Sequence, residues 1–298
     1  MTTDLPYGWQ RARLHQGALI FDTEPGLAQA LTDGFFFVAQ PAGLELEAGD
    51  RFAQRFYLPA TSDDPFCGFA RWTETQLGKH EGYFRRDVDQ TEQFFLERRF
   101  WSEVYPAQLA AQAEAMRAFS LELLGAVLAQ LDLPRTLWDE ATGRCLSGRG
   151  TYHLTFNHFR SSVRARGLNI HKDSGWVTVL RSLEPGLEVE RGGAWLPISP
   201  LPGFFIVNFG CAMEVLTRQS RTPVAAVAHR VVEQPEHRGG RADRFSYALF
   251  ADSSLDEAVC PGLFCYEPER GLTLAMSFRT FLDEILKNTY QPETAGLY

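Results

Sequence analysis

The chain has 298 residues, of which 45% are hydrophobic and 22% are charged, and its formal net charge is −8. This composition is typical of a folded globular protein and excludes an intrinsically disordered or a collagen-like chain. The acidic excess argues against nucleic acid as a partner, because phosphate binding needs clustered Lys and Arg. The length predicts one large domain or two closely packed ones.

We recognise no targeting or membrane segment in the sequence. No apolar run follows a basic start, so we expect no signal peptide, and no stretch approaches the roughly 18 apolar residues of a membrane span. The five cysteines are scattered, which predicts reduced thiols rather than a disulfide framework or a zinc site. We therefore expect a cytoplasmic protein with no membrane partner. Nothing in the sequence fixes its oligomeric state.

Residues 1–145 are predicted to form a mostly helical, mixed region. The apolar spacing predicts helices over residues 26–33 and 46–57, and the run of Phe and Val at 35–38 is typical of a buried strand. Residues 59–88 carry scattered Gly and Pro and predict an irregular loop region.

The strongest helical pattern covers residues 107–131. Apolar residues recur there at steps of three or four, Pro106 suits a helix start, and Pro134 follows the end. We expect this helix to support the second half of the chain.

Residues 150–252 change to the pattern of β-strands. Segments rich in β-branched and aromatic residues lie at 152–159, 176–180, 187–190, 194–198, 204–210, 224–232 and 245–250. Turns of Gly, Pro or charged residues separate them, and no helix between them is long enough to join parallel strands. This organisation predicts a sandwich or jelly roll. Residues 262–298 are predicted to be a C-terminal helical extension, with a helix around 277–289.

Three polar residues of this region can meet at one point. His171 and Asp173 lie two apart, and at the start of a strand such residues share a face, while Lys172 faces away. His229 lies in an apolar segment, where a histidine needs a partner or a metal. Alone, the first pair also suits a surface turn and His229 a core histidine. Together they match the facial triad of non-haem Fe(II) sites, which leaves three metal positions open.

A second pair, Arg244 and Ser246, also shares a strand face. The planar guanidinium can grip a carboxylate in two places, and the hydroxyl can add a further hydrogen bond. A buried arginine needs an anionic partner, which a bound dicarboxylate would supply.

These motifs together resemble the isopenicillin N synthase-like branch of the Fe(II)/2-oxoglutarate-dependent oxygenases. The resemblance rests on the H-x-D pair with the strand after it, on segments similar to PGLQV, G-x-W-x-x-V and PG-x-x-x-VN-x-G, on HRVV, and on R-x-S. These segments occupy residues 171–180, 186–189, 193–198, 202–210, 229–232 and 244–246. A weaker upstream match, at residues 33–38, is similar to the GFF-x-V strand of the family.

The resemblance implies a fold that is mainly β with flanking helices, with a double-stranded β-helix (jelly roll) core behind the N-terminal region. It also implies that His171, Asp173 and His229 bind Fe(II). Arg244 and Ser246 would then bind the distal carboxylate of the cosubstrate 2-oxoglutarate, and O2 would be the second cosubstrate.

The sequence departs from the family pattern at three places. The N-x-Y motif of the family reads Asn157-His158-Phe159, so Asn157 keeps a cosubstrate-binding assignment but the tyrosine hydroxyl is missing. The usual Gly-Asp pair reads Gly210-Cys211. The stretch between His229 and Arg244 is longer than usual, and residues 233–243 predict an extended polar hairpin.

The function implied by the resemblance is the oxidation of a C–H bond of a small-molecule substrate by hydroxylation, desaturation or oxidative cyclisation. We expect a role in specialised metabolism, such as antibiotic biosynthesis. Trp176, Arg160 and Phe159 are candidate substrate contacts, although they also suit a core aromatic, a surface charge and a barrel filler, respectively. The alternatives are a 2-oxoglutarate-independent iron oxidase of the isopenicillin N synthase type and a non-catalytic jelly-roll binding or sensor protein.

Overall fold

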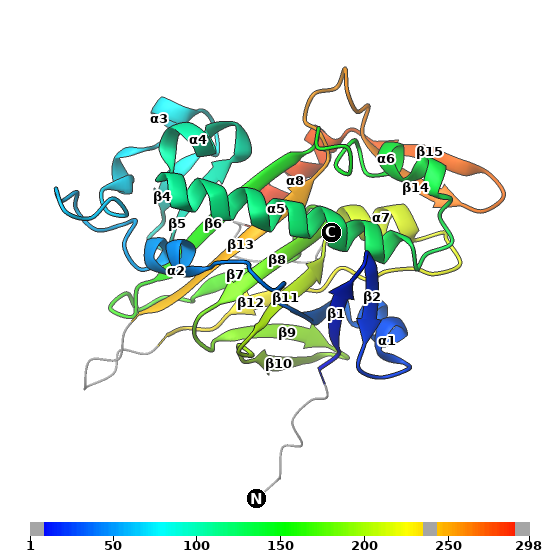
Figure 1. The fold of residues 1–298 in the computed structure, drawn as a ribbon, viewed down its shortest axis with the longest axis horizontal. Coiled ribbons are helices and arrows are strands. Elements are labelled where there is room, and N and C mark those ends of the chain that lie inside the picture. Colours follow the sequence, from blue (N-terminus) through cyan, green and yellow to red (C-terminus); the bar gives the residue numbers. More distant parts are fainter. Residues whose placement is uncertain (1–8, 235–242, 290–298) are drawn as a thin grey trace, which may run out of the picture.

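A large β-sheet forms the centre of the molecule (Figure 1). The computed structural model describes residues 9–234 and 243–289, and within them the large sheet has nine strands in the order β2-β1-β3-β11-β8-β13-β6-β5-β4. Their bounds are β1 Arg11–His15, β2 Ala18–Phe21, β3 Phe35–Ala39, β4 Gly82–Arg85, β5 Thr91–Glu97, β6 Thr151–Phe159, β8 Val177–Ser182, β11 Phe204–Phe209 and β13 Arg244–Asp252.

A smaller sheet faces the middle of the large one. It has the order β10-β9-β12-β7 and consists of β7 (Leu168–His171), β9 (Leu187–Arg191), β10 (Ala194–Ile198) and β12 (His229–Val231). Between β6 and β13 the chain passes back and forth between the two sheets, which is the winding of a jelly roll. The predicted mainly β fold with a jelly-roll core and flanking helices is therefore confirmed.

Helix α5 (Ala107–Leu128) crosses the outer face of the large sheet, over β13 and β8 (Figure 1). This confirms the predicted long helix, which ends three residues earlier than expected. Among the described residues no helix is long and apolar enough to cross a membrane. The other α-helices are α1 Gly26–Asp33, α2 Glu47–Ala53, α3 Glu74–Leu77, α4 Trp101–Val104, α6 Trp138–Ala141, α7 Cys211–Thr217 and α8 Phe278–Thr289, and short 3-10 turns lie at Phe69–Arg71, Arg98–Phe100 and Arg135–Leu137.

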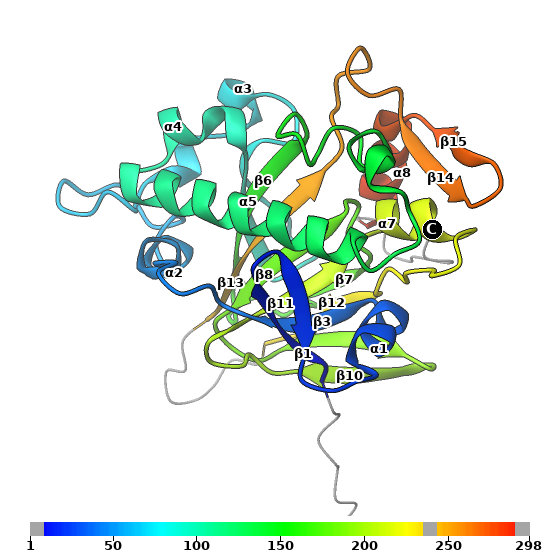
Figure 2. The ribbon, with the colours of Figure 1, turned by 45° about the vertical axis from the view of Figure 1, so that its right-hand side comes forward.

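The two faces of the large sheet bury different apolar clusters. Because side chains alternate along a strand, β13 directs Tyr247 and Leu249 to the core under α5, and Ala248 to the space between the sheets. Figure 2 shows α5 on one side of the large sheet and β10 below it. The face that carries Ala248 is called the inner face below, because it lines the jelly-roll interior where a ligand can bind.

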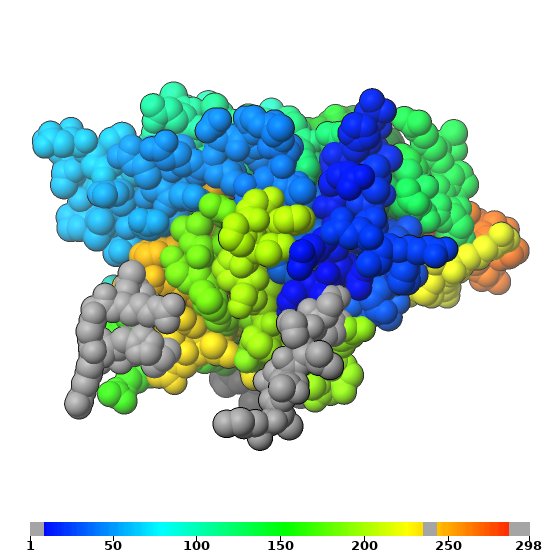
Figure 3. Space-filling model, turned by 60° about the horizontal axis from the view of Figure 1, so that its bottom comes forward, coloured from blue at the N-terminus to red at the C-terminus, as the bar shows by residue number. Residues whose placement is uncertain are grey.

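The predicted helical and mixed region of residues 1–145 contains more strands than expected. Strands β1 to β5 come from this region, and β3 and β5 pair with β11 and β6. Strand β4 lies inside the predicted loop region of 59–88, and β5 follows it. The polar residues of β4 and β5 interrupt the alternating pattern that predicts a strand. Pairing with neighbouring strands stabilises the two strands in spite of this. In Figure 3 the blue N-terminal atoms lie beside the yellow-green atoms of the barrel.

Several other boundaries also needed correction. The helix predicted at 46–57 is the shorter α2. The strand predicted at 224–232 is reduced to β12, because the residues before β12 form a loop. This loop donates a hydrogen bond from Ala225 N to Leu31 O near the end of α1. Ahead of the correctly predicted C-terminal helix lies an unpredicted hairpin of β14 (Leu263–Glu267) and β15 (Gly271–Met276). The predicted polar hairpin at 233–243 falls almost entirely outside the described residues. The division into domains at residues 145, 150, 252 and 262 stays a prediction.

The support that α5 gives to the sheet can be tested at Leu123, which is fully buried. Truncation to Ala removes packed methyl groups and leaves a cavity, so Leu123→Ala should lower the free energy of unfolding by about 2–5 kcal/mol. The neighbouring exposed residue provides a control, since Glu122→Ala should change it by less than about 0.5 kcal/mol. Equal effects of the two variants in urea denaturation would contradict this packing.

Candidate active site

His171, Asp173 and His229 meet at one end of the small sheet. His171 is the last residue of β7 and His229 the first of β12, and the two are direct partners in the antiparallel ladder. Asp173 lies in the loop between β7 and β8, and not on a strand as the sequence analysis expected. This loop is held in place because α7 donates two backbone hydrogen bonds to it, from Cys211 N to Asp173 O and from Ala212 N to Ser174 O.

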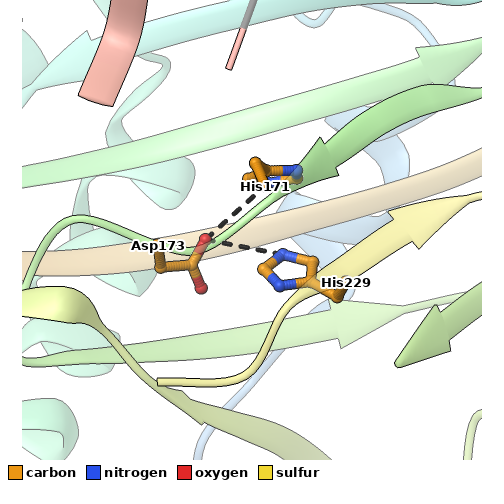
Figure 4. Close-up of side chains that lie close together, drawn as sticks. All are labelled: His171, Asp173 and His229. Carbon is orange, nitrogen blue, oxygen red and sulfur yellow. Dashed lines mark ion pairs between the residues drawn. The ribbon is translucent and has the colours of Figure 1, made fainter. Parts of the chain in front are cut away.

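The three side chains point toward one another (Figure 4). Asp173 Oδ1 lies 3.9 Å from His171 Nε2 and 3.5 Å from His229 Nε2, and one ligand atom from each residue falls within 4.8 Å of the others. Each histidine Nδ1 lies at hydrogen-bond distance from a backbone carbonyl, of Asn169 and of Val227 respectively. Nδ1 therefore carries the proton, and both Nε2 lone pairs face the space shared with the carboxylate. These donors fit a divalent transition metal.

The surroundings keep this cluster in the state that a metal requires. Burial, and next the charge of His229, lower the pKa of His171. The imidazole is therefore neutral at physiological pH and free to donate its lone pair. Asn208 on β11 donates a hydrogen bond from Nδ2 to Asp173 Oδ2, over 3.2 Å, so the other carboxylate oxygen remains directed at the histidines. The role of Asn208 cannot be read from the sequence, because only the pairing of β11 with β8 brings this residue to the triad.

The residues around the triad also agree with the predicted geometry. Lys172 turns away from the triad and forms an ion pair with Glu214 over 3.0 Å. Gly210 permits the close approach of α7, because a Cβ there would lie 2.3 Å from the carbonyl oxygen of Gly175. Cys211, which replaces the usual family aspartate, holds the loop through its backbone, and burial raises the pKa of its thiol to about 12.

Arg244 and Ser246 lie on the inner face of β13. The guanidinium of Arg244 donates hydrogen bonds to Pro185 O at 3.0 Å, to Ser182 Oγ at 2.9 Å and to Ser246 Oγ at 3.4 Å. Arg244 is 2% exposed, and its burial lowers its pKa to about 10, against the opposing charge of Glu184. Among the described residues no carboxylate lies within ion-pair distance of it. A buried guanidinium with unused donors fits an anionic ligand.

Asn157 and Phe159 border this arginine from β6. The ladder places Asn157 directly opposite Ser246, and Asn157 Oδ1 accepts a hydrogen bond from Gln93 Nε2 over 2.6 Å. Phe159 lies opposite Arg244, whose guanidinium carbon is 4.6 Å from the ring centroid. The ring that replaces the family tyrosine therefore supports the arginine through a cation–π contact.

The other two candidate substrate residues have structural partners. Trp176 is fully buried in the core under α5 and donates its indole hydrogen bond to Ser253 Oγ, which supports the core-aromatic interpretation. Arg160 is half-buried rather than a free surface charge, because its guanidinium donates to the carbonyls of Arg86, Asp89 and Gln90. A role of Trp176 or Arg160 in substrate binding stays a prediction.

A buried histidine that the sequence analysis did not assign stabilises the start of β13 from the outer face. His158 lies between Glu92 Oε1, 2.6 Å from Nδ1, and Asp243 Oδ2, 2.7 Å from Nε2. Its ring stacks on Tyr57 and Phe245, with centroids 3.8 and 5.0 Å away. Asp243 directly precedes Arg244, so the network fixes the backbone that carries the arginine. Only the pairing of β5, β6 and β13 brings these groups together.

Comparison with protein families agrees with this geometry. Residues 151–253 match the family model of the 2OG-Fe(II) oxygenase superfamily. The matched segment contains the triad, Arg244 and Ser246. The chain thus contains a domain of this superfamily, which confirms the resemblance found in the sequence at the level of the superfamily.

Curated relatives match over part of their length. The chain is 29% identical to Protein DMR6-LIKE OXYGENASE 2 of Arabidopsis thaliana over 185 residues, which cover 58% of this chain and 49% of the relative. It is 31% identical to thebaine 6-O-demethylase of Papaver somniferum over 125 residues, which cover 40% and 32%. The matches thus span about half of these relatives or less.

Solved structures support the fold. The rice dioxygenase for auxin oxidation superposes with a TM-score of 0.62 at 24% identity, over 88% of this chain and 90% of that one. A full-length Neurospora crassa protein, solved in complex with alpha-KG and 5-formyluracil, gives a TM-score of 0.64 at 18% identity, over 88% of each chain. At these identities the likeness establishes a common fold.

The metal-binding capacity of the triad can be measured without a substrate. His229→Ala removes one of the three donors, so it should weaken binding of Mn²⁺ or Fe(II) by roughly 100-fold or more, a larger loss than for residues that only orient ligands. Anaerobic calorimetry would measure it, with His15→Ala as a control, because His15 is exposed on β1. Unchanged affinity in the His229 variant would contradict the assignment.

The His158 network predicts a pH-dependent stability. Burial would raise the pKa of Glu92 and of Asp243. For Glu92, hydrogen bonds from His158 and Tyr83 outweigh this effect of burial and lower the pKa. For Asp243, hydrogen bonds from Ser161 and His158 outweigh it and lower the pKa. Carboxylates with lowered pKa stabilise the fold above their unfolded pKa and lose this contribution as the pH falls through the folded pKa.

His158→Phe keeps the aromatic stacking but removes both hydrogen bonds. The variant should therefore be less stable than the wild type by about 3 kcal/mol at pH 7, with a smaller gap at pH 3. Thermal unfolding at the two pH values measures the difference. A gap that is independent of pH would show that the carboxylates do not depend on His158.

Proposed function

We propose that the protein is an Fe(II)- and 2-oxoglutarate-dependent oxygenase that oxidises a C–H bond of a small molecule. The observation that carries the proposal is the combination, inside one jelly roll, of a metal-competent triad with a buried arginine that has no carboxylate partner among the described residues. A metal alone would suit many hydrolases and binding proteins. The buried charge of this arginine adds the need for an anion, which a dicarboxylate cosubstrate meets.

His171, Asp173 and His229 would hold the metal. Bound Fe(II) would supply, with 2-oxoglutarate and O2 as cosubstrates, the oxidising power for a C–H bond. The protein orients its ligands beforehand, since the carbonyls of Asn169 and Val227 fix the imidazoles and Asn208 fixes the carboxylate. The side chains of His171, Asp173 and His229 are only 14%, 3% and 8% exposed, so the surrounding protein keeps bulk water away from the site.

Arg244 and Ser246 would bind the distal carboxylate of 2-oxoglutarate. The guanidinium supplies charge and two parallel N–H donors, and the serine hydroxyl supplies a third hydrogen bond. Asn157, across the ladder from Ser246, would contact the cosubstrate beside them. Phe159 would act as a positioning residue, because its ring packs against the guanidinium of Arg244 and would hold the orientation of that group.

Two relatives support a small-molecule substrate, because their names describe such chemistry. They are the thebaine 6-O-demethylase and an oxoglutarate-dependent flavonoid 7-O-demethylase of Ocimum basilicum, 27% identical over 164 residues. We extend this to a role in specialised metabolism, such as antibiotic biosynthesis. The cytoplasmic location expected from the sequence is likewise a proposal.

The cosubstrate assignment predicts a selective effect of Arg244→Met. Without its charge-assisted hydrogen bonds, 2-oxoglutarate should bind about 100-fold more weakly, which corresponds to about 3 kcal/mol, while metal affinity stays unchanged. Arg230→Met is a matched control, because Arg230 adjoins His229 but forms an ion pair with Glu188 over 2.7 Å. Calorimetric titration with 2-oxoglutarate measures both variants.

Wild-type affinity in Arg244→Met would overturn the cosubstrate site. O2 consumption by the iron-loaded protein without any need for 2-oxoglutarate would favour the 2-oxoglutarate-independent oxidase. A protein that binds metal but consumes no O2 with any tested compound would favour the binding-protein alternative.

A further inference from the structure

A second charged residue lies on the inner face of β13, at the end opposite to Arg244. Because alternate residues share a face, the inner face carries, in order, Arg244, Ser246, Ala248, Phe250 and Asp252. Asp252 is 6% exposed. Neither the triad nor the proposed cosubstrate site uses it.

Asp252 contacts the loop that carries the triad aspartate. Ser174, the residue after Asp173, donates a hydrogen bond from Oγ to Asp252 Oδ1 over 3.1 Å. The carboxylate packs so closely on this loop that a Cβ at Gly175 would lie 2.4 Å from Oδ1. Asp252 therefore packs against the loop that carries Asp173, at the end of β13 opposite to Arg244.

The charge of Asp252 has no Lys or Arg counter-ion in the described part of the chain. Among the described residues it forms no ion pair with Lys or Arg, and its second oxygen, Oδ2, accepts no hydrogen bond. Burial raises its pKa to about 6, against the opposing influence of His153 and Ser174, and Asp173 adds to the rise. At pH 7 the group is therefore mostly ionised, and a buried carboxylate of this kind is stabilised by a cation.

Aromatic rings lie beside this carboxylate. Phe250 is two residues before Asp252 on the same face and lies opposite His153 in the ladder. His153 stacks on Phe95, with ring centroids 4.2 Å apart. The ring centroids of Phe95 and Phe250 are 6.5 Å apart. Both phenylalanines are only partly buried. A carboxylate near partly buried aromatic rings suits an organic ammonium group.

An unsatisfied hydroxyl on the same face independently indicates a ligand. Thr155 is 2% exposed, lies between His153 and Asn157 on the inner face, and its Oγ1 has no hydrogen-bond partner among the described residues. Buried hydroxyls are satisfied in most native structures, so one that is not requires a partner. Its place, opposite Ala248, lies between the Arg244 end and the Asp252 end of the inner face.

We propose that the substrate carries a basic nitrogen, which binds as an ammonium ion to Asp252 beside Phe250, with Thr155 as a further polar contact. This inference rests on the proposed oxygenase function and names the substrate class for it. The opposite charges at the two ends of β13 would also sort the ligands. Arg244 would repel the cationic substrate and Asp252 would repel the anionic cosubstrate, so each ligand would have one place on the inner face.

The test uses matched probes on the full chain loaded anaerobically with Fe(II) and 2-oxoglutarate. Each pair consists of an amine and the alcohol with the same skeleton, benzylamine with benzyl alcohol and tryptamine with tryptophol. We expect the wild type to bind the amines at least about tenfold more tightly than the alcohols, as measured by calorimetry. Asp252→Asn, which keeps the shape and removes the charge, should abolish this preference.

Two control variants separate charge from structure. Ser174→Ala removes the hydrogen bond to Asp252 but keeps its charge, so the preference for amines should persist. Asp256→Asn changes the net charge equally at a position beyond the end of β13, and should bind the probes as the wild type does. Thermal unfolding confirms that each variant is folded.

The outcomes distinguish this inference from the proposed function. Equal binding of amine and alcohol, no binding of any amine, or an unchanged preference in Asp252→Asn would overturn the amine proposal. If 2-oxoglutarate still binds to the metal-loaded protein in those cases, the proposed function stands. If 2-oxoglutarate does not bind at all, the proposed function itself fails.

Discussion

The pairing of β7 with β12 is the contact on which the site depends. It sets His171 directly opposite His229, so two imidazoles from residues far apart in the sequence face one space. The third donor comes from a loop, which α7 holds by its backbone. The metal site is therefore preorganised, because one strand ladder and the start of α7 define it, and because a carbonyl partner at each Nδ1 orients the rings.

Two buried charges without oppositely charged partners among the described residues define the rest of the inner face of β13. Arg244 and Asp252 are both buried on one face of β13, and neither has an oppositely charged partner among the described residues. An unpaired buried charge lowers stability, so a fold that retains two of them indicates that ligands complete them. The inner face of β13 is thus polarised along its length, with the proposed anion site at one end and the proposed cation site at the other.

The sequence could predict what depends on residue type and short spacing. The triad, the R-x-S pair and the long helix followed from such patterns. Asn208, His153, Thr155 and Asp252 could not be recognised, because their roles depend on the register between strands distant in sequence. Strands β4 and β5 were missed for a related reason, since their places depend on the pairing of β5 with β6 and of β4 with β5. The loop at 224–228 has the small apolar residues of a strand, but these residues contact α1 and form no part of a strand.

The central claim is that the triad and Arg244 form one site for Fe(II) and 2-oxoglutarate. Anaerobic titration of the Fe(II)-loaded protein with 2-oxoglutarate tests it most directly, by following the visible metal-to-ligand charge-transfer band. We predict a band that saturates at one equivalent and is lost in His171→Ala. A folded, iron-loaded wild-type protein that shows no band would contradict the account.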